Sequence, residues 1–205
     1  MNTFLDSAFQ KLQSPAKSIM IGTFYAAALF SLLGSVANFD DGFFSAIGEL
    51  IMMVILVALW AIVPTLLLLK KEDLAKKVFP FVLFYWLINE LSNLFASAGW
   101  IKSKVSGLLV TIGIFEFFIA LAFIAAIVLI VLGLIKKTDK FTKLSFAIFA
   151  CTFLLYFVVF ILRVIVEAKY KAAWSDYLET IVSTLVLPVG VFFAALFFFP
   201  PKQTA

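Results

Sequence analysis

The chain of 205 residues contains no histidine and a single cysteine, Cys151, which lies inside an apolar run. A disulfide within the chain is therefore impossible. Histidine-ligated haem, the usual zinc sites and catalysis by a histidine base are excluded as well. The GxSxG, GxGxxG, Walker and HExxH patterns are also missing, so the sequence predicts no enzyme, no cofactor and no metal site.

Charge is scarce too, because only 14% of the residues are charged while 64% are hydrophobic and 26 are phenylalanine. A soluble domain is about half apolar and about a quarter charged, so this composition predicts an integral membrane protein with the lipid bilayer as its main partner. The net charge of +4 comes from lysines clustered at the ends of apolar runs. Membrane topology accounts for such lysines, and we expect no nucleic-acid partner.

The apolar residues fall into six segments, each long enough to cross about 30 Å of hydrocarbon as a helix. They run approximately over 18–38, 46–69, 78–100, 105–135, 144–167 and 179–199. We therefore expect an all-α membrane protein, a polytopic bundle of six transmembrane helices over 18–200. A short N-terminal amphipathic helix over 1–17 precedes it, with a break at Ser14–Pro15, and 201–205 form a tail.

The positive charges divide unequally between the two ends of these helices. Eleven lysines fall on one side and five cationic residues on the other, which together make the sixteen in the chain. Because cytoplasmic loops are enriched in Lys and Arg, both termini are expected in the cytoplasm, with the protein in the plasma membrane. The inner loops 70–77 and 136–143 share the spacing KKxDxxxK. An internal duplication and convergence of basic loops both explain this match.

A few polar residues interrupt the apolar segments. Ionisable groups inside a membrane cost about 3 kcal/mol, so they face protein or water. We expect a cluster that lies between the third and fourth segments and serves either transport or helix packing. Its members are Glu116, Glu90, Asn89 and Asn93, with Arg163 at the outer rim of the cluster and Glu167 one helical turn beyond Arg163.

Arg163 and Glu167 are four residues apart near the outer end of the fifth segment, so the spacing predicts an interfacial ion pair. Pro64 and Pro188 each remove a backbone donor and predict a kink or a break in their helices. Small side chains in the first segment predict a face for close helix contact, either internal or with a membrane protein partner. These residues are Gly22, Ala26, Ala27, Ser31 and Gly34.

Two classes of function fit these features. The first is a small transport-type protein or the membrane-embedded binding subunit of a transporter. Size, six spans and inward termini make the chain similar to the substrate-binding subunits of energy-coupling-factor transporters, although FYAAALFSLLG (24–34) departs from their AxxxA docking spacing. The second class is a non-catalytic membrane subunit or scaffold that assembles with a larger membrane complex.

Overall fold

The computed structural model describes residues 2–37, 43–103, 107–136, 139–171 and 174–200. Within these ranges the chain is helical apart from short turns, as the long apolar segments predict. The helices are α1 (Asn2–Ala37), α2 (Phe43–Leu68), α3 (Glu72–Ser103), α4 (Gly107–Lys136), α5 (Asp139–Tyr170), α6 (Trp174–Ile181), the π-helical segment η1 (Val182–Val186) and α7 (Leu187–Phe198).

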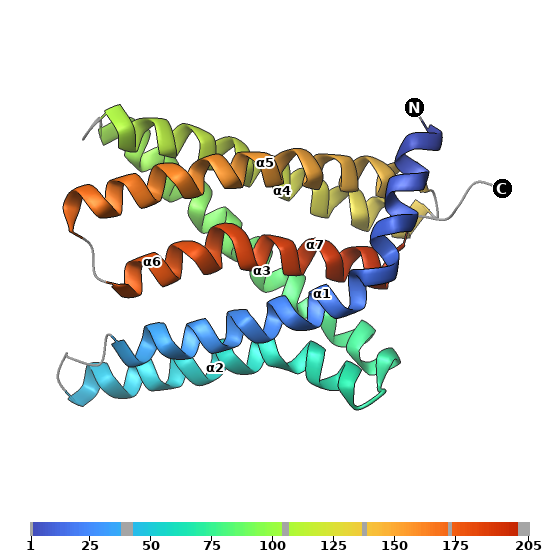
Figure 1. Ribbon diagram of the computed structural model, residues 1–205, viewed down its shortest axis with the longest axis horizontal. Helices are drawn as coiled ribbons and strands as arrows, with labels where there is room; N and C mark the ends of the chain where they lie inside the picture. Colours follow the sequence, from blue (N-terminus) through green and yellow to red (C-terminus); the bar gives the residue numbers. More distant parts are fainter. Residues whose placement is uncertain (1, 38–42, 104–106, 137–138, 172–173, 201–205) are drawn as a thin grey trace.

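Two antiparallel hairpins form the sides of the bundle (Figure 1). The hairpin of α1 and α2 lies on one side, and the hairpin of α4 and α5 lies on the other. Between them, α3 crosses from α2 to α4, while α7 packs mainly against α1. The beginning of α1 and the end of α7 lie at the same end of the bundle as the turn between α2 and α3.

Among the described residues, three helices contain stretches long and apolar enough to cross a membrane. These stretches are Gln10–Leu33, Gly107–Gly133 and Lys140–Lys169. Two shorter apolar stretches, Met53–Leu68 and Leu187–Phe198, lie in α2 and α7. The structure thus supports an all-helical membrane protein, whereas six separate crossings stay a prediction.

The N-terminal segment does not end at Ser14–Pro15 as the sequence predicted. Instead α1 continues from Asn2 to Ala37 with Pro15 inside it, and the helix bends strongly along its course (Figure 1). A proline removes one backbone donor and crowds the preceding turn, which bends a helix without ending it when neighbouring turns hold. The membrane-surface position of 1–17 stays a prediction. Phe4, Leu5 and Phe9 belong to the apolar face that predicts it, and their side chains lie outside the described residues.

The two proline sites that the sequence singled out behave differently. Pro64 lies buried inside α2, and the helix continues through it to Leu68. Pro188 lies in the first turn of α7, directly after the π-helical residues of η1. A π-helical turn accommodates a missing donor by shifting the hydrogen-bond register, so the sixth apolar segment becomes three consecutive helical pieces.

A chain of aromatic rings joins the helices through the core. Its ring centroids are 6.2 Å apart for Trp60 and Trp86, 5.7 Å for Trp86 and Phe123, and 4.7 Å for Phe123 and Phe149. Phe149 in turn lies 6.1 Å from Phe192 of α7. These contacts link α2, α3, α4, α5 and α7. The Trp86–Phe123 pair is tilted and the other three are edge-to-face, and aromatic pairs of this kind stabilise a core beyond the area that they bury.

The helices α1 and α7 are in close contact at Gly190, which is buried. A Cβ atom at this position would lie 2.7 Å from two ring carbons of Phe24 and 2.9 Å from the hydroxyl of Thr23. The Phe24 side chain is itself fully buried, so its ring has no free space to move into. Glycine is therefore required at 190 for this helix crossing.

Candidate functional site

The centre of the candidate site is an ion pair between α4 and α5. Glu116 Oε1 accepts a hydrogen bond from Arg163 Nε at 2.7 Å and lies 2.6 Å from Arg163 Nη2. The Glu116 side chain is 13% exposed and that of Arg163 is 29% exposed. The pair is therefore largely shielded by the protein, and its two short contacts are of the charge-assisted kind.

Helix geometry explains how an arginine near one end of α5 reaches a glutamate deep in α4. The two helices are antiparallel, and Ser145 Oγ of α5 donates to the carbonyl of Ala126 in α4 at 2.8 Å, which helps to fix their register. Side chains tilt toward the N-terminus of their own helix. In an antiparallel pair, the side chains of Glu116 and Arg163 consequently lean toward each other. The carboxylate and the guanidinium meet at a level along the helices that lies between the two Cα atoms.

A second carboxylate lies one turn further along α5. Glu167 Oε1 accepts a hydrogen bond from the hydroxyl of Thr180, which is buried in α6. The other oxygen, Glu167 Oε2, is buried and has no hydrogen-bond partner among the described residues. Buried oxygens of this kind are uncommon in folded proteins, and each one requires an explanation.

The predicted pair between Arg163 and Glu167 is thus replaced by two contacts with other helices. The guanidinium joins α5 to α4, and the second carboxylate joins α5 to α6. Sequence spacing suggested the local pair because residues four apart share a helix face. Thr180 was missed, since a threonine in an apolar segment often bonds its own backbone and gives no distinct signal.

The predicted partners of Glu116 on α3 lie outside the part of the chain whose side chains are described. The structure places positions 89, 90 and 93 on α3, which packs against α4. The side chains of Asn89, Glu90 and Asn93 therefore stay predicted members of the cluster. Within the described residues, no group of three cysteine or acidic side chains is placed to hold a metal ion.

The small residues of the first helix do not share one environment. Ala27 is fully buried in the core, Ala26 and Ser31 are half-buried, and Gly22 is exposed. Gly34 lies outside the residues whose side chains are described. Part of this set therefore packs inside the bundle, and a partner surface along α1 stays a prediction.

Comparison of the chain with protein-family models, with curated proteins and with solved structures gives no match. The polar site and the apolar character of the helices are therefore the features that bear on function.

Proposed function

We propose that the chain is a small transport-type membrane protein, and that Glu116, Arg163, Glu167 and Thr180 form its polar site. In this proposal the site takes up a small cation, the proton included, with Glu167 as the residue that exchanges it. The observation that carries the proposal is the buried Glu167 Oε2, which has no partner among the described residues.

The charges of the site support uptake of a cation. Arg163 is paired with Glu116, so its positive charge is already balanced by one carboxylate. Glu167 adds a second carboxylate, whose described hydrogen bond comes from a neutral hydroxyl. If all three groups are ionised, the set carries one excess negative charge, and a buried charge of this kind is stabilised by a bound cation or removed by a proton.

The position of the site beside a break in the helix supports a change in helix packing as well as the binding of a cation. Glu167 contacts α6 at Thr180, directly before the π-helical residues 182–186 and Pro188. Broken helices and π-helical turns are enriched at functional sites of membrane transporters. A carboxylate that changes its charge beside such a segment is well placed to alter how α6 packs on α5.

The first prediction compares the thermal stability of the wild type with that of Glu167→Gln. A ligand that binds only the folded state at 100 times its Kd stabilises it by about 2.7 kcal/mol. We expect the unfolding midpoint of the wild type in detergent to depend on the cation, with choline as reference, or on pH. The Glu167→Gln protein should lose the response to the cation and show a smaller response to pH, because the amide neither binds the cation as a carboxylate nor titrates.

The matched control is Glu72→Gln, which removes an exposed carboxylate that pairs with Lys17. This variant should keep the wild-type dependence on cations and pH. Identical profiles for the wild type and Glu167→Gln would contradict the assignment of Glu167.

A non-catalytic membrane subunit is the second candidate, and the short contacts between Glu116 and Arg163 favour it. Polar pairs between helices also serve to fix packing, with no ligand involved. In that case Glu116→Gln and Glu167→Gln should change stability alone. The loss of a cation or pH response described above separates the two candidates.

We further propose that the chain crosses the plasma membrane six times, with α6, η1 and α7 as the sixth crossing and both termini in the cytoplasm. The excess of lysines at one end supports this orientation. That end includes the turn between α2 and α3, the beginning of α1 and the end of α7 (Figure 1).

The second prediction tests this topology with single cysteines in a Cys151→Ala background. Asp73→Cys and Asp139→Cys should be protected from an impermeant thiol reagent in intact cells. Asp40→Cys, Ser103→Cys and Trp174→Cys should be labelled there. Labelling of position 73 or 139 from outside would show that the orientation is wrong.

A further inference from the structure

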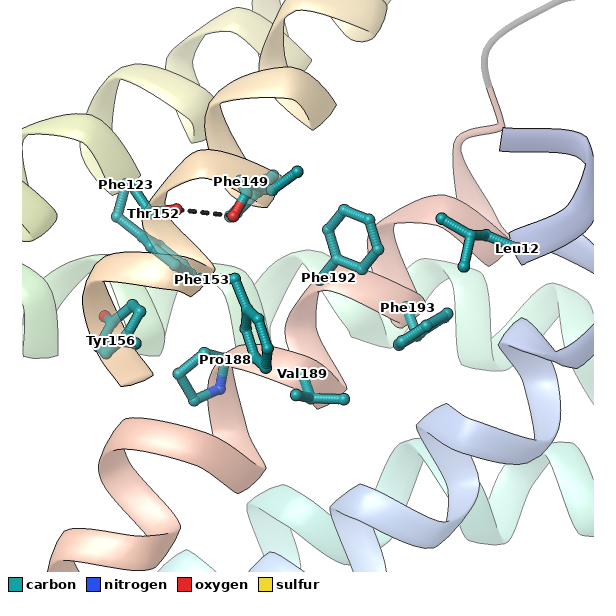
Figure 2. Close-up of a pocket in the computed structure, with 11 residues that line it drawn as sticks. Leu12, Phe123, Phe149, Thr152, Phe153, Tyr156, Pro188, Val189, Phe192 and Phe193 are labelled. Atoms are coloured by element: carbon teal, nitrogen blue, oxygen red, sulfur yellow. Dashed lines mark hydrogen bonds between the residues drawn. The ribbon is translucent and has the colours of Figure 1, made fainter. Parts of the chain in front are cut away.

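An apolar cavity of about 270 Å³ lies between α5 and α7 (Figure 2), and its described lining contains no residue of the polar site. Aromatic rings form much of its wall, and Leu12 of α1 lies at one end while Tyr156 and Pro188 lie at the other. A buried apolar cavity of about 150 Å³ is already large enough to bind benzene. The cavity is therefore of a size and an elongated form that suit a hydrocarbon chain.

The described residues that line the cavity present no polar group that needs a ligand as its hydrogen-bond partner. Thr152 is the one lining residue with an aliphatic hydroxyl, and this hydroxyl donates to the carbonyls of Ile148 and Phe149 at 3.0 and 2.9 Å. The hydroxyl of Tyr156 points away from the cavity in Figure 2. No charged side chain is among the described lining residues. The part of a ligand that enters is consequently hydrocarbon.

One side of the cavity lies at the outer surface of the helix bundle. Phe153 lines the cavity and is 38% exposed, and its neighbours Leu154 and Phe157 on α5 are 70% and 52% exposed. In a membrane these side chains meet lipid, because large apolar surfaces of this kind do not face water. A hydrocarbon chain from the surrounding bilayer therefore has a direct lateral entrance.

Two exposed lysines lie at chain positions close to the Leu12 end of the cavity, one in α1 and one at the start of α5. Lys11 directly precedes Leu12 and is exposed, and Lys140 is exposed in the first turn of α5. From the start of α5, the lining residues Phe149 to Tyr156 are about 15 to about 26 Å along the helix. A lipid with its headgroup at the lysines would thus extend its chain along α5 toward Tyr156.

We propose that the cavity binds one acyl chain of an anionic phospholipid, with the headgroup at Lys11 and Lys140. Apolar contact holds the chain, and the two lysines select the negative headgroup, at about fivefold in affinity per lysine, equivalent to ~1 kcal/mol each. This site shares no residue with the polar site, so the proposal is independent of cation uptake at Glu167.

The fluorescence of the buried tryptophans reports whether a lipid chain occupies the cavity. Trp60 and Trp86 are 2% and 1% exposed, and Trp86 contacts Phe123, which lines the cavity. The other two of the four tryptophans are replaced by Trp100→Phe and Trp174→Phe. The protein is placed in phosphatidylcholine nanodiscs with increasing fractions of phosphatidylglycerol that carries brominated acyl chains, which quench tryptophan over short distances.

We expect saturable quenching at low fractions of the brominated phosphatidylglycerol. Phosphatidylcholine with the same brominated chains should require at least about tenfold more lipid, in line with the two lysines. Quenching that rises linearly with both lipids shows no site and overturns the proposal. Saturation at equal fractions of both lipids overturns the anionic ligand.

Two pairs of variants locate the site. Ala150→Phe places a ring at the lining and should remove the saturable quenching, whereas Leu154→Phe adds the same ring on the exposed face and should leave it unchanged. Lys11→Gln with Lys140→Gln should abolish the preference for phosphatidylglycerol. Lys70→Gln with Lys71→Gln, exposed lysines at the same end, should retain it. Saturable quenching that survives Ala150→Phe would contradict binding in this cavity.

Discussion

Replacing Glu116 with leucine is expected to destabilise the folded protein by about 3 kcal/mol, the largest effect among the substitutions proposed for the site. The change leaves the guanidinium of Arg163 inside the bundle without its carboxylate. An unpaired arginine within a membrane segment costs about 3 kcal/mol on insertion scales, and breaking a buried pair in a soluble protein costs a similar amount. The measurement is the free energy of unfolding, from thermal or denaturant melts in detergent.

The double variant Glu116→Leu with Arg163→Met separates the charge from the packing. Replacing both members of a buried pair by apolar side chains is often neutral or stabilising, so the double variant should recover most of the lost stability. Glu116→Gln should lie between the wild type and Glu116→Leu, because the amide oxygen still accepts a hydrogen bond. A double variant as unstable as Glu116→Leu would show that the pair is not the source of the effect.

Replacing Gly190 with leucine is expected to cost about 3 kcal/mol as well, through steric conflict. The first added carbon already lies 2.7 Å from the ring of Phe24, and the further carbons of leucine have no space between α1 and α7. Thermal melts in detergent should therefore show a large fall in the unfolding midpoint. Gly190→Ala should give a smaller fall in the same direction.

Gly22 provides the matched control for this substitution. It lies on α1, is exposed, and a Cβ atom there would meet nothing within 4 Å. Gly22→Leu should therefore be neutral or stabilising, since leucine favours a helix over glycine by up to about 1 kcal/mol. Equal losses at 190 and 22 would contradict the steric explanation.

The helices could be predicted from the sequence because their apolar segments are long and contain few charges. Such segments have a single favourable conformation in lipid, so their existence depends on composition more than on detailed packing. The ends of the helices are harder to predict from the sequence. At Pro15 and at 182–188 the outcome depends on whether neighbouring turns and helices compensate for a missing donor, and local sequence does not determine that.

The candidate site was predicted in its charged members but not in the contacts that the structure describes. Glu116, Arg163 and Glu167 were identified because charges in apolar segments are costly. A partner of Glu116 was predicted at matching depth on α3, and that prediction lies outside the described side chains. The contact that the structure describes is with Arg163 of α5. Cα positions alone give the wrong depth for long side chains, and Thr180 carries no signal until α6 is seen to pack on α5.

The central claim is that Glu167 exchanges a proton or a small cation, and infrared difference spectroscopy of the purified protein tests it directly. Spectra recorded between two pH values, and between cation and choline buffers, report protonation or coordination of individual carboxyl groups. We predict a carboxyl band that responds to pH or to the cation in the wild type and in Glu72→Gln, and that is missing in Glu167→Gln. Unchanged carboxyl difference bands in Glu167→Gln would contradict the proposed function.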